Sequence, residues 1–253
     1  MLNIALNTFR ELKRNKILYM ILFFGILLII FSLVLASLSM WQTDKIILDF
    51  WLSMIEIFGL VSVIFIGSQL IFKEIDGKTI YLILSKPIKR YEFIIGKFLG
   101  FALILAAIIF FQSVIFLALV WYSKANFTAL ILISIFFIYI KLLVLFAIIL
   151  FLSTFISSIL SIILTILVYF ISHSITAIID MAGHLNSFLM YNIGRFFYII
   201  FPPFEALNIK SIVSSTIQIS PAYVVANLIY AIAYTILILG LTIVIFNKKT
   251  FEN

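Results

Sequence analysis

Six apolar runs, each long enough to cross a lipid bilayer, constrain this chain more than any other feature. They cover approximately residues 17–40, 52–72, 98–122, 129–152, 159–181 and 222–246. A membrane-spanning helix needs roughly 20 apolar residues, and lipid-exposed backbone must satisfy its hydrogen bonds within its own helix. The sequence therefore predicts an all-α integral membrane protein, with six transmembrane helices in a single domain over residues 1–253.

Composition agrees with this class and excludes several others. The chain is 65% hydrophobic and 11% charged, whereas soluble proteins average about 45–50% apolar and about 25% charged residues. It has no Cys, which excludes disulfides, thiolate metal sites and Cys nucleophiles. The net charge of +7 comes from basic residues that flank the apolar runs. That distribution is typical of membrane orientation signals, and no nucleic-acid partner is expected.

The positions of the basic residues predict the orientation. If the N-terminus is cytoplasmic, twelve Lys and Arg lie on the inner side and four on the outer side, these four being Lys45, Lys124, Arg195 and Lys210. Inner loops carry the excess of basic residues in membrane proteins. We therefore expect a multi-pass protein of the plasma membrane with both termini in the cytoplasm.

Two segments outside the apolar runs are predicted to contain short helices at the membrane surface. Residues 1–16 place apolar side chains on one helical face, namely Leu2, Ala5, Leu6, Phe9 and Leu12, as in helices that lie in the interface. The external loop 182–221 is too apolar to be a solvated linker, and its prolines and glycines prevent it from spanning. Short interfacial helices suit it best.

The longest polar interruption, residues 73–97, is the strongest candidate for a functional element. It holds six of the 17 basic residues, and its apolar centre at 79–84 (TIYLIL) is bounded by Gly77 and Pro87. Gly and Pro commonly mark the boundaries of helices. The pattern predicts a short amphipathic helix that lies along the inner membrane face and presents itself to a cytosolic partner.

The residues of this loop resemble the first cytoplasmic loop of ABC-2 type permeases, and within them the branch named for multicopper-enzyme maturation. The spacing Pro-x-Phe-Glu-x-x-Asn, formed by Pro202, Phe204, Glu205 and Asn208, is similar to the segment before the last span in the same branch. The resemblance implies that residues 1–16 form an elbow helix and that the loop is a coupling helix, seated in a groove of an ATP-binding cassette ATPase subunit. The residues expected to carry this coupling are Glu74, Gly77, Thr79, Tyr81, Leu82, Leu84, Ser85, Pro87, Arg90 and Lys97.

Catalytic and cofactor motifs are missing from the sequence. Gly77-Lys78-Thr79 copies the end of a phosphate-binding loop, but position 72, where the first Gly of that motif belongs, is Phe72. No zinc-protease or nucleophile-elbow motif occurs. The chain is therefore expected to be neither an enzyme nor a metal protein and to hold no cofactor, with ATP and Mg²⁺ bound only by the ATPase subunit.

Lys141 stands twelve residues into the fourth apolar run, close to mid-depth. A charged side chain there is costly, so it normally faces protein or water. Its side chain is expected to reach toward Glu56 or Asp180, near the outer ends of their spans. Three interpretations remain: a buried pair that joins helices, a cationic position on a substrate path lined by the same residues, or a side chain that snorkels along an apolar surface.

Together these features predict the transmembrane permease subunit of an ATP-driven ABC-2 type exporter. Its expected partners are the ATPase, a second copy or a related permease, and membrane lipids. The alternatives are an integral membrane enzyme acting on lipid-like substrates and a membrane assembly factor that transports nothing. The sequence leaves the substrate open among copper or sulfur species, lipids, peptides and drugs.

Overall fold

The computed structural model describes residues 2–14, 19, 23, 25, 43–77, 89–122, 128–185, 187–213 and 220–248. Within this part of the chain all regular structure is helical, which confirms the all-α prediction. The elements are α1 (Leu2–Lys13), α3 (Thr43–Ser62), η1 (Val63–Gly67), α4 (Ser68–Asp76), α6 (Arg90–Tyr122), α7 (Ala129–Ser153), α8 (Ser158–His184), α9 (Phe188–Ile200), η2 (Phe204–Leu207), α10 (Lys210–Val213) and α11 (Pro221–Lys248).

Five helices in the described residues are long and apolar enough to cross a membrane. They are Leu48–Glu74, which runs through α3, η1 and α4, and Arg90–Trp121, Ala129–Ser153, Ser158–His184 and Pro221–Lys248. Each overlaps one of the predicted spans. The predicted span at 17–40 lies outside the described residues, apart from Tyr19, Phe23 and Gly25.

The helix α6 begins earlier than the sequence suggested. It starts at Arg90, so residues 90–97, which the sequence placed in the polar loop, form its first two turns. The other side of the loop is also helical as far as Asp76. The polar loop is therefore anchored at both ends by helices that continue into membrane spans.

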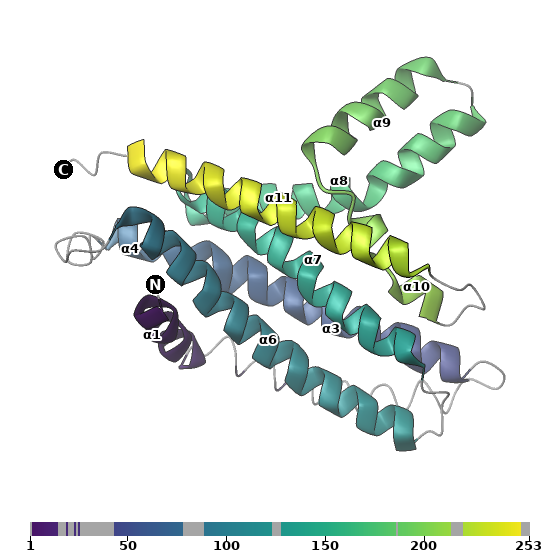
Figure 1. The fold of residues 1–253 in the computed structure, drawn as a ribbon, viewed down its shortest axis with the longest axis horizontal. Coiled ribbons are helices and arrows are strands. Elements are labelled where there is room, and N and C mark those ends of the chain that lie inside the picture. Colours follow the sequence, from purple (N-terminus) through teal and green to yellow (C-terminus); the bar gives the residue numbers. More distant parts are fainter. Residues whose placement is uncertain are drawn as a thin grey trace.

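The five long helices form a bundle in which α7 is central (Figure 1). Its most apolar stretch is the most buried of the five, whereas those of α8 and α11 are the least buried. Phe146 of α7 stacks on two rings of α6, with centroid distances of 4.0 Å to Phe101 and 5.4 Å to Phe98. Stacked aromatic pairs of this kind give α6 and α7 a close, specific contact.

One turn of π-helix, η1, interrupts the span formed by α3 and α4. It contains Gly67, where an added Cβ would lie 3.1 Å from the Phe146 ring. A glycine at this point lets the wider turn approach α7 closely. Such π-turns occur mostly singly inside α-helices and are frequent at functional sites.

The N-terminal helix α1 lies against the first half of α6. At Gly100 of α6 an added Cβ would stand 2.6 Å from Thr8 Cβ and 2.7 Å from the Ala5 carbonyl oxygen, so the two helices meet where no side chain intervenes. Ala5, Thr8 and Leu12 are buried in this contact, while Leu2 and Leu6 on the predicted apolar face stay exposed. Part of the apolar face of α1 therefore packs against α6, and the rest of that face is exposed.

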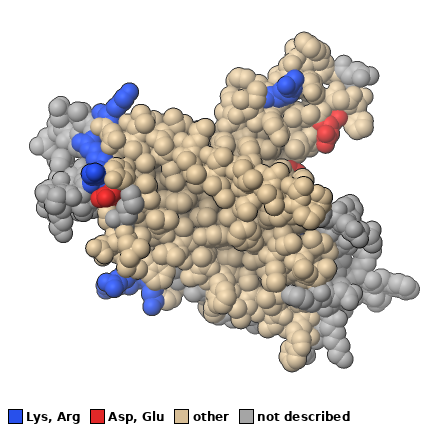
Figure 2. All heavy atoms as spheres, in the orientation of Figure 1, with Lys and Arg blue, Asp and Glu red and all other residues tan. Residues whose placement is uncertain are grey.

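One end of the bundle gathers α1, the end of α4, the start of α6 and the end of α11 (Figure 1). Most of the Lys and Arg side chains visible in Figure 2 lie at this end, which we call the basic end. Figure 1 shows α9 and α10 away from it. Short helices do occupy the described part of the predicted loop 182–221, as α9, η2 and α10.

Candidate functional site

The predicted coupling residues divide into two groups. Thr79, Tyr81, Leu82, Leu84, Ser85 and Pro87 lie outside the described residues. Glu74, Gly77, Arg90 and Lys97 are described, and they lie at the two ends of the loop, in the last turn of α4 and the first turns of α6. The Gly77 amide donates to the Lys73 carbonyl oxygen at 2.9 Å and so closes the last turn of α4.

An ion pair between Lys97 and Glu74 closes the base of the loop. Glu11 of α1 lies on the other side of the ammonium group, 3.6 Å from Lys97 Nζ. Lys97 is 5% exposed and the Glu74 side chain is 15% exposed. One lysine therefore joins α1, α4 and α6, and it holds the two ends of the loop together.

Arg90 joins the other end of the loop to the last span. Its Nη1 donates to the carbonyl oxygens of Phe246 at 3.1 Å and Asn247 at 2.9 Å, near the end of α11. The last carbonyls of a helix have no partner within the helix, and a basic side chain stabilises them. The Phe93 and Phe246 rings stack beside this contact, with centroids 5.7 Å apart. The start of α6 and the end of α11 therefore form one unit.

A second polar site lies within the bundle and is centred on Glu56 of α3. Its Oε1 is 2.5 Å from Lys141 Nζ, and its Oε2 is 2.7 Å from Lys210 Nζ. The hydroxyl of Tyr169 donates to Oε1 at 2.7 Å, and His173 Nε2 is 3.7 Å from the same oxygen. We call these five residues the Glu56 cluster; it joins α3, α7, α8 and α10.

Lys210 reaches Glu56 because the preceding segment folds back against the bundle. Phe204 is fully buried and packs on two rings of α8, with centroids 6.0 Å from Tyr169 and 5.6 Å from His173. The turn that follows is closed by Asn208 Nδ2, which donates to the Glu205 carboxylate at 3.1 Å. The prolines before Phe204 exclude a regular helix at this point, so the chain enters η2 in an extended conformation.

The arrangement of charges in the Glu56 cluster indicates a structural role. Glu56 and Lys141 are each 1% exposed, and one carboxylate pairs with two ammonium groups, one through each oxygen. Losing one member of a buried ion pair leaves a costly uncompensated charge. The cluster therefore makes the packing of four helices depend on one carboxylate.

The structure brings together some of the residues that the sequence proposed and leaves others apart. Lys141 does pair with Glu56, whereas Asp180 is exposed near the end of α8 and is outside the cluster. Sequence analysis did not single out Lys210, Tyr169 or His173 as members of this site. A usable signal was present: Tyr169 and His173 are four residues apart, on one face of an apolar helix.

The described residues contain no group of three or more His, Asp or Glu side chains that could hold a metal ion. The Glu56 carboxylate is paired with Lys141 and Lys210. His173 Nδ1 lies 3.1 Å from the Tyr169 carbonyl oxygen. Both polar sites join helices that are distant in the sequence.

Comparison with known proteins gives one match and one negative result. A family model described as ABC-2 family transporter protein matches residues 2–251. A comparison with curated proteins finds no similar sequence. The family match covers nearly the whole chain and includes both polar sites.

Proposed function

The chain belongs to the ABC-2 family of transporter proteins, and from this premise we propose that it is the permease subunit of an ATP-driven exporter. A separate ATP-binding cassette ATPase supplies the energy and binds ATP and Mg²⁺. The family match over residues 2–251 is the observation that carries the proposal. The five membrane-length helices of the described residues support it.

ATP energy reaches such a chain only through contact with a partner, because its sequence has no complete phosphate-binding loop. The polar loop between α4 and α6 is the best candidate for that contact. The end of α4 and the start of α6, which bound this loop, lie at the basic end (Figure 1). The connection between α7 and α8, also at that end, has only residues 154–157.

The contacts around the loop support a mechanical role. Lys97 with Glu74 holds the two ends of the loop together, and Arg90 ties the start of α6 to α11. Because Lys97 is almost fully buried, its part in coupling is to fix the loop, whereas direct contact with the ATPase falls to residues 79–87. ATP-driven closure of two ATPase subunits would then displace α4, α6 and α11.

We further propose the finer features that the resemblance implied. These are a sixth span at 17–40, α1 as an elbow helix in the inner interface, a coupling helix within 78–85, and assembly with a second copy or a related permease. We also propose that the chain belongs near the branch of multicopper-enzyme maturation permeases, because its loop residues resemble that branch. The membrane is the plasma membrane, with both termini cytoplasmic.

For Lys141 we favour the buried-pair interpretation over a substrate path. Its ammonium group is 2.5 Å from the Glu56 carboxylate, and both side chains are 1% exposed. A position that attracts an anionic substrate needs contact with water or with the substrate itself. We therefore assign Lys141 and Glu56 to holding helices together, and Asp180 to an exposed position near the end of α8.

The experiment is capture of the ATPase by the tagged full-length chain from its native membranes, with mass spectrometry to identify the partner. Small interfaces concentrate their binding energy in a few large residues, each contributing about 2 kcal/mol or more. Replacing Tyr81 and Leu84 together by Ala is expected to weaken capture about tenfold or more, since 1.4 kcal/mol is a factor of ten. ATP hydrolysis linked to transport is expected to fall with it.

The matched control replaces Phe155 and Ile156, in the short α7–α8 connection at the same end, together by Ala. This variant is expected to capture the ATPase at wild-type strength. If both double variants behave like wild type, the loop is not the coupling element. If the wild-type chain captures no ATPase at all, the exporter proposal itself is wrong, and the chain is a membrane enzyme or an assembly factor.

A further inference from the structure

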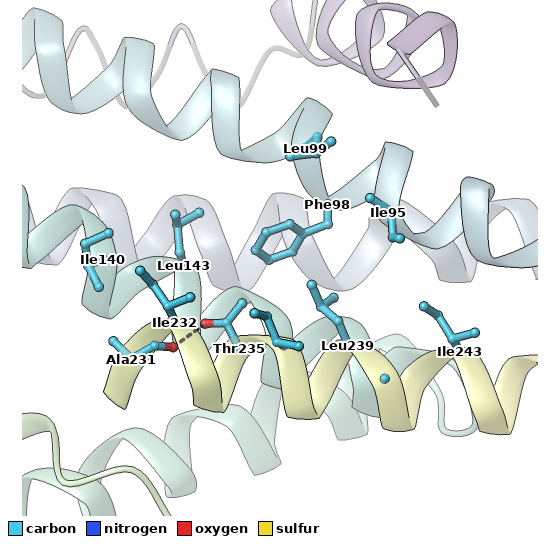
Figure 3. Close-up of a pocket in the computed structure, with 12 residues that line it drawn as sticks. Ile95, Phe98, Leu99, Ile140, Leu143, Ala231, Ile232, Thr235, Leu239 and Ile243 are labelled. Carbon is cyan, nitrogen blue, oxygen red and sulfur yellow. Dashed lines mark hydrogen bonds between the residues drawn. The ribbon is translucent and has the colours of Figure 1, made fainter. Parts of the chain in front are cut away.

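An apolar groove of about 470 Å³ runs along the outside of the bundle between α6, α7 and α11. Figure 3 shows side chains of all three helices directed toward it, among them Phe98 of α6, Leu143 of α7 and Leu239 of α11. The single polar side chain in its lining is Thr235, whose hydroxyl donates to the Ala231 carbonyl oxygen at 2.8 Å. The groove therefore offers nothing to water and suits an apolar occupant.

Small residues on α11 create the groove. Ala231, Thr235 and Gly240 lie along the lining where larger side chains would fill the space. A Cβ added at Gly240 would meet no atom within 4 Å. Gly240 differs in this respect from Gly100, where α1 occupies the space above the glycine. The space above Gly240 is therefore open.

The length of the groove matches one leaflet of a bilayer. On α11 the lining extends from Ala231 to Ile243, which is about 18 Å at about 1.5 Å per residue. The hydrocarbon core of a bilayer is about 30 Å thick, so one leaflet supplies about 15 Å. The lining begins ten residues after Pro221, the first residue of α11, and ends five residues before Lys248, its last, so the groove lies slightly nearer the basic end than the opposite end.

The volume and apolar lining of the groove suit a single hydrocarbon chain. Such a chain packs about 4 Å from neighbouring carbon atoms and fits this groove.

Positive charge lies at the end of the groove where a headgroup belongs. Lys89 and Lys248 are exposed there, and Arg90 bridges the ends of α6 and α11. Glu92, half-buried in the first turn of α6, is the opposing acid. Among the described residues at the start of α6 and the end of α11, this excess of basic over acidic side chains favours an anionic headgroup, and the effect is strongest close to the membrane surface.

We infer that this groove is a binding site for an anionic phospholipid of the leaflet at the basic end, with one acyl chain in the groove and the headgroup beside Lys89 and Lys248. The bilayer is as apolar as the groove, so the chain alone gains little by entering it. The basic residues supply the selectivity, and the groove fixes the position. The inference does not rest on the exporter proposal, because it needs only that α6, α7 and α11 span a membrane.

The test uses the full-length chain reconstituted in nanodiscs of equal parts phosphatidylglycerol and phosphatidylcholine, released into detergent and weighed by native mass spectrometry. Gly240→Trp places a large side chain in the groove. It is expected to lower the population carrying phosphatidylglycerol at least threefold. The matched control is Leu241→Trp, which puts the same side chain at the same depth on the exposed face outside the lining. This control is expected to retain lipid as wild type does.

A second variant addresses the headgroup and leaves the groove intact. Lys89→Glu with Lys248→Glu is expected to abolish the preference for phosphatidylglycerol over phosphatidylcholine. Thermal melting is recorded for every variant, and if Gly240→Trp melts early, Gly240→Leu takes its place. Wild-type retention of phosphatidylglycerol by a folded groove variant overturns the inference. Retention with a loss of oligomer also overturns it, and would assign the groove to a second copy of the chain.

Discussion

Lys210 Nζ lies 2.7 Å from Glu56 Oε2, although the two residues are 154 positions apart in the sequence. Lys210 begins the short helix α10, whereas Glu56 lies in α3, which is part of a membrane-length span. The same carboxylate is paired with Lys141 through its other oxygen. One buried acid therefore fixes both the central helix α7 and the segment that leads to the last span. Stability of the whole bundle is expected to depend on it.

Glu56→Gln keeps the shape of the side chain and removes its charge, which leaves two lysines without a counter-charge. Loss of one partner from a buried ion pair costs about 3–5 kcal/mol. We expect Glu56→Gln to lower the melting temperature in detergent most, Lys141→Met less, and Lys210→Met least, because the Lys210 side chain is 24% exposed. Glu56→Gln combined with Lys141→Met is expected to be more stable than Glu56→Gln alone.

A different order of melting temperatures would contradict the structural assignment of the cluster. A Lys141→Met variant with wild-type stability and reduced substrate-stimulated ATPase activity would assign the lysine to a substrate path instead. Wild-type stability together with wild-type activity would mean that Lys141 contributes to neither.

The contact between α1 and α6 is tested at Gly100. Gly100→Ala places a Cβ 2.7 Å from the Ala5 carbonyl oxygen, and overpacking of this kind costs about 1–3 kcal/mol. The control is Gly183→Ala in α8, where the added Cβ meets nothing within 4 Å. There the replacement is expected to be neutral or to stabilise by up to about 1 kcal/mol, because Ala favours helix over Gly. Equal melting temperatures for the two variants would show that α1 does not pack closely on α6.

The base of the polar loop is tested by measuring the contributions of Glu74 and Glu11, the two acids around Lys97, separately. Lys97→Met leaves the largely buried Glu74 without its cation, which is expected to cost about 1–3 kcal/mol. Glu11→Gln removes the outer acid, which is 63% exposed and 3.6 Å away, and is expected to cost at most about 1 kcal/mol. Melting temperature and ATPase capture are measured on both variants. A larger loss for Glu11→Gln would mean that the contact with α1, rather than the pair at the loop base, is the critical one.

Orientation is testable without background labelling, because the chain has no Cys. Single-cysteine variants Leu185→Cys, after α8, and Asn247→Cys, at the end of α11, both place the thiol at exposed positions. A membrane-impermeant maleimide is expected to label Leu185→Cys in intact cells and Asn247→Cys only after permeabilisation. The reverse pattern would invert the topology derived from the basic residues.

Sequence alone predicted the features that depend on local pattern. The lengths of the apolar runs predicted six spans, and the structure describes helices at five of them. These could be predicted because the residues of a span specify it by their own length and hydrophobicity. A lysine in the middle of a span required a partner, which pointed to Glu56 or Asp180, and the structure pairs it with Glu56. Lys210 could not be found in this way, because its position depends on how residues 201–213 fold back onto α8. The pairing of Lys97 with Glu74 was also missed, since both residues were assigned to contact with a partner subunit.

The π-turn η1 changes which sides of the second span its two acids face. Glu56 and Glu74 are 18 positions apart, which is five full turns at 3.6 residues per turn, so a regular α-helix would direct both to the same side. The extra residue of the π-turn shifts the helical phase by about 100°. Glu56 can thereby meet α7, α8 and α10 while Glu74 meets α6. If that turn relaxed to a regular α-helix, the half-span beyond it would have to rotate about its axis, and one of the two acids would leave its lysine.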